Sequence, residues 1–338
     1  MTIAENMRPL SLVDTFGRVH DYLRISLTER CNLRCTYCMP EEGIAMRPKS
    51  HFMQHHEVAA IAATFARLGV KKIRITGGEP LVRNDLAKII ASLSRLNVEL
   101  AITTNGLLLD KYIDCLKANG LRSVNVSLDS LDPTTYNRIT RRNYFEKVMS
   151  NISILLKNDF NVKLNAVILR GVNDHELPEF VRFTQTRDIH FRFIEFMPFS
   201  GNRWREDKGL TRAEMLDSIH AAFPGKVTRL TDSPGSRDEY FRLNGFAGTF
   251  GVIGSVTNPF CDTCNRIRLT ADGRLRNCLF SANETDLLSL LRAGEDIVPH
   301  IFESVLHKKA MRGGSGSVQQ LSEESFHHNS RAMHTIGG

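Results

Sequence analysis

Along the first two hundred positions, short hydrophobic runs alternate with longer patterns that have helical spacing. The strand-like runs are 23–27, 72–76, 99–103, 123–128, 163–169 and 191–196. Apolar residues spaced three and four apart predict helices near 56–68, 84–96, 108–119, 144–157 and 176–187. Strands that alternate with helices predict an α/β fold with a parallel sheet, curled into a full or partial barrel. An open doubly wound sheet is the alternative, and either fold places its ligand site at the carboxyl ends of the strands.

The pattern changes after residue 197. Residues 200–206 have the composition of a loop, and a helix is expected at 211–223. Short runs at 226–230, 240–243 and 249–253 suggest antiparallel strands, and helices are expected near 284–293 and 296–309. We therefore predict a core at 1–200, a C-terminal α+β domain at 201–312, and a flexible tail at 313–338 that ends in Gly337 and Gly338.

Three cysteines directly follow the first predicted strand. Cys31, Cys35 and Cys38 form a CxxxCxxC motif, with Tyr37 before the last cysteine. Three thiolates on one loop can hold a [4Fe–4S] cluster and leave one iron open to a small molecule. A zinc site or three reduced core cysteines are the alternatives at this stage.

A second triad lies far along the chain, at Cys261, Cys264 and Cys278. A structural zinc site usually has four ligands, so three cysteines without a nearby histidine favour a second iron–sulfur cluster. Arg266 and Arg268 follow directly and share one face if their segment is extended. Two guanidinium groups beside an open iron would suit a substrate that carries phosphate.

Polar groups recur where the predicted strands end. The ends carry Gly77-Gly78-Glu79, Thr103-Thr104-Asn105, Ser127-Leu128-Asp129 and Glu195-Phe196-Met197. Each alone is ordinary turn chemistry, but their recurrence favours one shared site. Arg24, Arg74 and Lys163 lie within strands, where a cation is costly unless it meets an anion or solvent.

Composition narrows the class of protein. The 338 residues include seven cysteines, six of them in the two triads, which indicates metal chemistry in a reducing compartment. The net charge of +7 fits an anionic substrate or a solvated basic surface. We expect no nucleic-acid partner, no membrane span and no signal peptide, and hence a cytoplasmic protein, with a mature organellar form left open.

The motifs together resemble one family. CNLRCTYCMP, TGGEP, TTNG, NVSLDS, RFIEFMPF, CDTCNRIRL, NCLF and the terminal double glycine occur in this order. In these motifs the chain resembles the GTP 3′,8-cyclases, which are the MoaA-type radical S-adenosylmethionine (SAM) enzymes of molybdenum cofactor biosynthesis. The resemblance implies a partial (β/α)6, TIM-like barrel, two [4Fe–4S] clusters, and SAM as cofactor.

The resemblance also implies roles for individual residues. Cys31, Cys35 and Cys38 would hold the SAM-cleaving cluster, and Cys261, Cys264 and Cys278 the auxiliary cluster. The SAM contacts would be Tyr37, Gly78, Ser127 and Met197. The GTP contacts would be Arg24, Arg74, Thr103, Lys163, Arg266, Ile267 and Arg268. The catalytic group would comprise Arg266, Arg268, Gly337 and Gly338.

The implied reaction is a radical cyclisation. A 5′-deoxyadenosyl radical from SAM would take the hydrogen from C3′ of GTP, and the C3′ radical would then bond to C8. Reduction of the resulting aminyl radical, through the second cluster, would give 3′,8-cyclo-7,8-dihydro-GTP. The implied partners are a flavodoxin-like electron donor, the next enzyme, cyclic pyranopterin monophosphate synthase, and a second copy in a homodimer. The rival interpretations are a peptide-modifying radical SAM enzyme and a non-catalytic iron–sulfur or zinc regulator.

Overall fold

The computed structural model describes residues 11–40, 42–44, 47–230, 239–323 and 331–337. Its described residues form a sheet of twelve strands in the order β12-β11-β10-β1-β2-β3-β4-β5-β6-β9-β8-β7. The six central strands are parallel neighbours in sequence order, as the alternation predicted. They are β1 Tyr22–Ser26, β2 Lys72–Thr76, β3 Glu99–Thr104, β4 Ser123–Ser127, β5 Asn161–Ile168 and β6 His190–Glu195.

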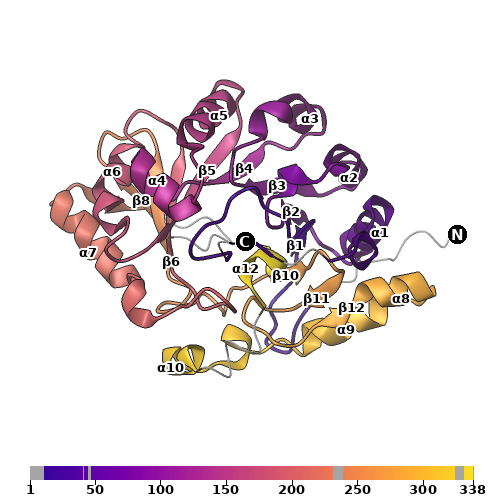
Figure 1. The fold of residues 1–338 in the computed structure, drawn as a ribbon. Helices are drawn as coiled ribbons and strands as arrows, with labels where there is room; N and C mark the ends of the chain where they lie inside the picture. Colours follow the sequence, from indigo (N-terminus) through magenta and orange to yellow (C-terminus); the bar gives the residue numbers. More distant parts are fainter. Residues whose placement is uncertain (1–10, 41, 45–46, 231–238, 324–330, 338) are drawn as a thin grey trace, which may run out of the picture.

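Helices cover the outer side of these strands in an arc (Figure 1). They are α1 His55–Arg67, α2 Leu86–Leu93, α3 Ile113–Ala118, α4 Pro133–Thr140, α5 Phe145–Lys157, α6 Leu177–Arg182 and α7 Arg212–Ala222. In β5, Val162, Leu164 and Ala166 are buried among the core residues, whereas Lys163 and Asn165 alternate with them. This period of two places polar side chains on the inner side of the curved sheet. The partial barrel predicted from the sequence is therefore confirmed.

Helix α4 was not predicted from the sequence. It begins with Pro133 after Asp132, whose carboxylate accepts a hydrogen bond from the Thr135 backbone N–H at 2.7 Å. Proline at the first helical position and an aspartate cap favour a helix start, although the apolar periodicity of this segment is weak.

The C-terminal third continues the same sheet on both sides. Its elements are β7 Val227–Arg229, β8 Glu239–Leu243, β9 Thr249–Ile253, β10 Arg266–Leu269, β11 Arg274–Arg276, β12 Thr285–Asp286, α8 Leu287–Ala293, α9 Val298–Leu306, α10 Val318–Ser322 and α12 Met333–Ile336. The expected antiparallel pairing occurs between β7, β8 and β9. In addition, β9 pairs in parallel with β6, and β10 pairs in parallel with β1. The division near residue 200 stays a prediction, and this pairing places both parts in one sheet.

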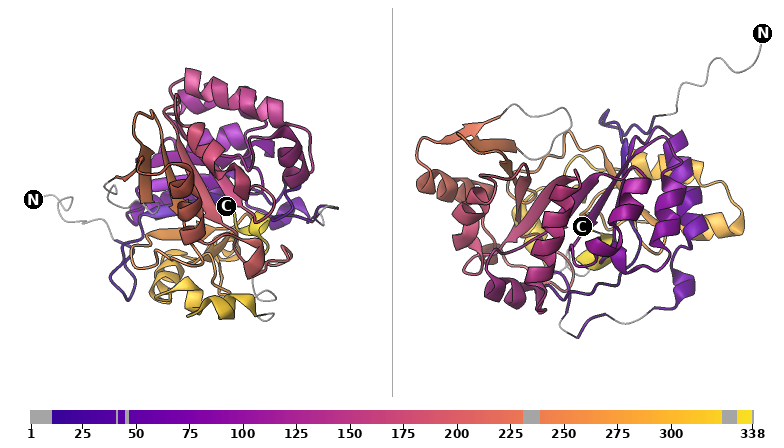
Figure 2. Two further views of the ribbon diagram at one scale, coloured as in Figure 1. Left: turned by 90° about the vertical axis from the view of Figure 1, so that its left-hand side faces the viewer. Right: turned by 90° about the horizontal axis from the view of Figure 1, so that it is seen from above.

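The C-terminal segment lies inside the arc of helices. Helix α12 is central in Figure 1, and both views in Figure 2 place it within the molecule. Ile336 is 1% exposed and packs with Phe199 and Phe280. Whether the tail moves stays a prediction, and Gly338 lies outside the described residues. No helix in the described parts of the chain combines the length and apolar character needed to span a bilayer.

Candidate active site

The first cysteine triad lies on the loop that follows β1. The Cys31 sulfur accepts hydrogen bonds from the Leu33 backbone N–H at 3.4 Å and from Asn105 Nδ2 at 3.7 Å. Burial raises the pKa of the Cys31 thiol to about 11 and that of the Cys38 thiol to about 12. Thiols in such a setting ionise when a metal centre binds them, because coordination displaces the proton. Within the described ranges, no group of His, Cys, Asp or Glu is arranged to hold a single metal ion.

The glycine loop after β2 supports the cysteine loop. The Gly78 backbone N–H donates to the Thr28 carbonyl oxygen at 2.6 Å. A Cβ on Gly78 would lie 2.4 Å from the Arg30 carbonyl oxygen and 2.7 Å from that of Glu29. Only a residue without a side chain permits two loops to approach so closely. The double glycine therefore has a structural role next to the triad.

Buried carboxylates at the strand ends bind backbone amides. Glu79, Asp129 and Glu195 each accept at least one backbone N–H bond, and Asp129 also accepts the Tyr37 hydroxyl at 2.7 Å. Burial raises the pKa of Glu79 to about 7 and that of Asp129 to about 6, against the hydrogen bonds that lower them. These carboxylates connect loops, so the expectation that the strand-end polar groups share one ligand site stays a prediction for them. The backbone donors are Leu81 and Asn105 for Glu79, Val167 for Asp129, and Arg212, Val256 and Thr257 for Glu195.

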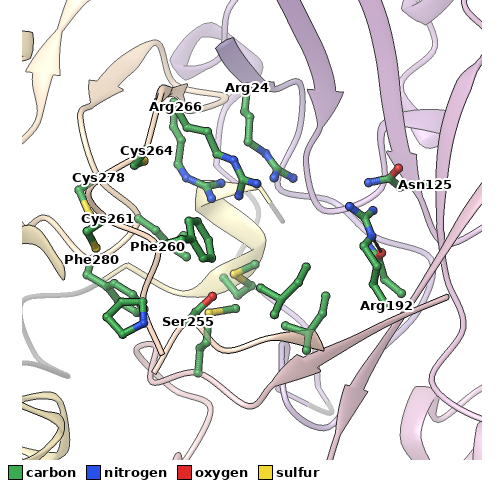
Figure 3. Close-up of a pocket in the computed structure, with 18 residues that line it drawn as sticks. Arg24, Asn125, Arg192, Ser255, Phe260, Cys261, Cys264, Arg266, Cys278 and Phe280 are labelled. Carbon is green, nitrogen blue, oxygen red and sulfur yellow. Dashed lines mark hydrogen bonds between the residues drawn. The ribbon is translucent and has the colours of Figure 1, made fainter. Parts of the chain in front are cut away.

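The second triad lines a pocket together with four arginines (Figure 3). The pocket has about 1010 Å³ of space, including the part that is open to solvent. Arg24 comes from β1, Arg192 from β6, and Arg266 and Arg268 from β10. Arg24 and Arg268 are paired in register, and Arg266 lies two positions before Arg268 on the same strand. The prediction that Arg266 and Arg268 share one face is confirmed, since both line this pocket.

The electrostatics of the pocket favour an anion. Burial, and next the charge of Arg268, holds the pKa of Arg24 well below its usual value. Burial also lowers the pKa of Arg268 to about 10. Of the described residues that line the pocket, none is an aspartate or glutamate. Several guanidinium groups without a carboxylate among the lining residues suit a ligand with several negative charges.

Unsatisfied polar atoms surround the same space. Thr103 Oγ1, Asn125 Oδ1 and Arg266 Nε are buried and have no hydrogen-bond partner within the described part of the chain. Thr103 and Asn125 are register partners on β3 and β4, and Asn125 lines the pocket. Buried polar atoms are nearly always paired, so these atoms indicate where a polar ligand or water binds.

The tail reaches both parts of this region. Arg268 Nη1 donates to the Gly337 carbonyl oxygen at 2.7 Å. His334 Nδ1 lies 3.5 Å from the carbonyl oxygen of Cys38, on the first cysteine loop. Met333 lines the pocket and packs near Cys278. The described tail therefore lies between the two triads, beside the arginines.

The remaining sequence-predicted residues lie in different surroundings. Met197 lines the pocket, and Ser127 lies half-buried at the end of β4. The Ile267 side chain is fully buried among the core residues, so only its backbone is available to a ligand.

Two predicted cations lie elsewhere among the described residues. Arg74 donates to the Tyr22 hydroxyl at 2.5 Å and to the Ile102 carbonyl oxygen at 3.0 Å, and it is not a lining residue. Lys163 donates to the Tyr240 hydroxyl at 2.7 Å and lines a second, more open pocket at the amino ends of β5 and β6.

Sequence reasoning missed Asn125 and Arg192, which both line the arginine pocket. Asn165, which the sequence placed with Lys163 at an inward-compatible spacing on the fifth predicted strand, lines the pocket as well. Arg192 carried the signal that singled out Arg24, namely a cation within a β run. The two asparagines lie within strands, where a buried amide needs a partner.

Comparison with known proteins matches both halves of the chain. Residues 25–184 match the radical SAM superfamily, and residues 189–313 match the family described as Molybdenum Cofactor Synthesis C. The chain is 44% identical over 323 residues to the protein named "GTP 3′,8-cyclase, mitochondrial" of Arabidopsis thaliana, covering 94% of this chain and 83% of the relative. The chain belongs to the GTP 3′,8-cyclase family.

Other relatives agree with this membership. A GTP 3′,8-cyclase of Rhodopirellula baltica is 42% identical over 340 residues, covering 98% of this chain and 93% of the relative. Human molybdenum cofactor biosynthesis protein 1 is 42% identical over 327 residues, and the chain spans 51% of its length. The solved structure of Streptococcus suis SuiB bound to S-adenosylmethionine aligns with a TM-score of 0.61 and 16% identity, over 95% of this chain and 78% of that one. At that identity the likeness concerns the fold alone.

The donor sets fit the cofactors of this family, which are iron–sulfur clusters and SAM. Each triad offers three sulfur atoms and no oxygen ligand, as iron–sulfur clusters require. Protein N–H groups also bond to the sulfurs, at Cys31 in the first triad and at Cys261 and Cys264 in the second. Such bonds are a usual means by which proteins orient and tune cluster ligands.

Proposed function

We propose that this chain converts GTP to (8S)-3′,8-cyclo-7,8-dihydroguanosine 5′-triphosphate, the first step of molybdopterin biosynthesis. The observation that carries the proposal is the arginine pocket, in which four guanidinium groups and the second cysteine triad face one space. The names of the relatives favour this activity over a peptide-modifying enzyme or a non-catalytic regulator.

We assign the triphosphate to the arginines and the purine to the region of the second triad. Arg24, Arg192, Arg266 and Arg268 supply positive charge, and Phe260 and the triad lie across the pocket from Arg192. Apolar walls with a few polar groups are typical of small-molecule sites. Arg266 lies over the Phe260 ring at 5.4 Å from its centroid, which holds that guanidinium group in place.

We assign SAM and its cluster to the first triad. When bound there, a reduced [4Fe–4S] cluster supplies the radical chemistry through SAM. The chain supplies the position: Gly78 supports the cysteine loop, Asp129 holds the Tyr37 hydroxyl, and Met197 lies between the two regions. Bringing SAM and the ribose of GTP together in one space provides the proximity that the hydrogen transfer needs.

The roles of the remaining predicted residues are also proposals. Gly337 brings a carbonyl oxygen to Arg268, which would fix that guanidinium group for the substrate. Arg74 and Lys163 would hold residues that contact GTP, or would bind the end of the triphosphate that lies farthest from the ribose. On family grounds we further propose a flavodoxin-like electron donor, a homodimer, transfer of the product to cyclic pyranopterin monophosphate synthase, and a cytoplasmic location.

Anaerobic turnover tests the proposed function. The protein is incubated with dithionite, SAM and GTP, and mass spectrometry measures 5′-deoxyadenosine and the cyclised nucleotide. We expect both products from the unaltered chain, and neither from a Cys35→Ala variant. In a Cys261→Ala variant we expect the cyclised nucleotide to be lost. Formation of 5′-deoxyadenosine with no change to GTP in the unaltered chain would refute GTP as the substrate.

A further inference from the structure

A buried lysine contacts the second cysteine triad from outside the pocket. Lys308 is 3% exposed, and its Nζ lies 3.4 Å from the Cys264 sulfur. The same Nζ donates to the Arg266 carbonyl oxygen at 2.8 Å and lies 3.4 Å from His20 Nδ1. Among the described residues, no carboxylate forms an ion pair with Lys308. Its three contacts therefore comprise a carbonyl oxygen, an imidazole nitrogen and a cysteine sulfur.

His20 fixes the direction of this ammonium group. His20 Nε2 lies 3.0 Å from Asp14 Oδ2, and both residues are buried. Because a carboxylate only accepts hydrogen bonds, we assign the ring proton to Nε2, which leaves Nδ1 to accept from Lys308. The resulting chain of contacts runs from Asp14 through His20 and Lys308 to the Cys264 sulfur.

The N-terminal hairpin, closed by an antiparallel bridge between Val13 and Val19, carries Asp14 and Arg18 and holds the backbone around the triad. Arg18 Nε donates to Asp14 Oδ2 at 2.6 Å, and Arg18 Nη1 donates to the Cys261 carbonyl oxygen at 2.8 Å. Arg18 Nη2 donates to the Lys309 carbonyl oxygen at 2.9 Å. Asp14 therefore connects, through Arg18 and His20, the cysteine loop and the segment that carries Lys308. The distance between Lys308 and Cys264 is set by buried contacts on both sides.

We propose that Lys308 is a positioning residue that sets the reduction potential of the iron–sulfur group held by Cys261, Cys264 and Cys278. This inference rests on the proposed function, in which that triad binds a cluster. A buried ammonium group is costly unless an anion lies beside it, and a cysteine thiolate bound to iron supplies that anion. The N–H···S bond and the positive charge both stabilise electron density on the cluster.

The sign of the effect follows from charge. Reduction by dithionite adds one electron, and hence one negative charge, to the cluster. A cation at hydrogen-bond distance from a ligand sulfur stabilises the reduced form more than the oxidised form. Loss of Lys308 therefore lowers the reduction potential of the cluster. We expect the equilibrium constant for reduction to fall at least about 10-fold, which corresponds to about 59 mV for one electron.

The test is an anaerobic redox titration of the cluster-loaded full chain, followed by electron paramagnetic resonance. Lys308→Met removes the charge and the donor at similar length, and we expect the potential of the second cluster to fall by about 59 mV or more. Lys308→Arg keeps the charge and should restore most of the potential. Lys309→Met is the matched control, because it removes the same charge from an exposed neighbour and should leave the potential unchanged. The first cluster in each sample is the internal reference.

The outcomes separate this inference from the proposed function. A Cys264→Ala variant that keeps its full iron content would refute the second cluster itself. If iron falls in that variant but Lys308→Met titrates like the unaltered chain, only the role of Lys308 is overturned. If Lys308→Met does not keep the cluster, Lys308→Gln decides, because its amide still donates to sulfur without a charge. We expect a lower potential in that variant, and an unchanged one would also overturn the inference.

Discussion

Arg331 lies outside the pocket and anchors the segment that enters it. Its Nη1 and Nη2 each donate to one oxygen of Asp272 at 3.0 Å, and Nη2 also donates to Glu284 at 2.7 Å. The Arg331 side chain is 21% exposed and that of Asp272 is 9% exposed. Hydrogen bonds from Arg331 and Thr270 outweigh burial and hold the pKa of Asp272 down to about 2. This ion pair should therefore hold the tail in its position beside Arg268.

An Arg331→Met variant tests this anchoring role. Hydrogen bonds to a charged group contribute about 1.5 to 3 kcal/mol, so losing this pair should favour release of the tail by about 2 kcal/mol. Every 1.4 kcal/mol is a factor of ten, so the population of the released state should rise about 30-fold. Hydrogen exchange followed by mass spectrometry measures this population, because amide exchange reports local opening. The peptide that contains 331–337 should exchange about 30-fold faster in the variant.

Arg274→Met is the matched control for this experiment. Arg274 lies 3.1 Å from Asp286 and 3.9 Å from Glu284, and its side chain is 40% exposed. Arg274, on β11, therefore adjoins Asp272 and Glu284 as Arg331 does, but it does not belong to the tail segment 331–337. Exchange of the tail should be unchanged in this variant. Equal exchange in Arg331→Met and the unaltered chain, or equal acceleration by both variants, would contradict the anchoring role.

Three further predictions concern Arg266 beside the second triad, Gly78 beside the first triad, and His20 next to the N-terminal hairpin. Charge removal in Arg266→Met should abolish GTP cyclisation but leave the iron content unchanged, so a variant that still forms the cyclised nucleotide would refute its role. Gly78→Ala should overpack the cysteine loop, lower the free energy of unfolding by about 1 to 3 kcal/mol and lower the iron content by about half. Gly316→Ala is its control and should keep the full iron content, because its Cβ would meet only Gln320, at 3.6 Å. Burial, and next the charge of Lys308, lowers the pKa of His20 from 6.5 to about 4, so the unfolded chain binds this proton first as pH falls. Urea unfolding should therefore show the free energy of unfolding falling by at most about 3 kcal/mol from pH 6.5 to 4. In His20→Asn the free energy of unfolding should depend less steeply on pH. An unchanged pH dependence in that variant would count against the lowered pKa of His20.

The local pattern of apolar and polar residues was enough to predict most of the central sheet. The run at 72–76 coincides with β2, and the other five runs overlap the parallel strands that the structure shows. Alternation is a strong signal in these strands because one side packs against helices and the other faces the site. The parallel pairing of β10 with β1 had no such signal, since Arg24 and Arg268 lie far apart in sequence and neither strand encodes its partner locally.

The parts of the candidate site that could be predicted from the sequence are those built from uncommon residue patterns. A cysteine triad, or an arginine within a β run, is uncommon enough to indicate a role without coordinates. Lys308 has no such feature, because a lysine after a helix is ordinary and its burial depends on His20, 288 positions away. Contacts of this kind arise from tertiary packing and appear only in the folded chain.

The distribution of charge explains why this site needs its ligand. The buried carboxylates at the strand ends bind backbone amides, so they do not neutralise the arginines inside the sheet. Arg24 and Arg268 lie side by side on paired strands and are buried, which opposes their charged forms. Burying like charges together destabilises a fold unless an anion offsets them. The described residues that line the pocket include no aspartate or glutamate, so a polyanion such as a nucleoside triphosphate would offset this charge when it binds.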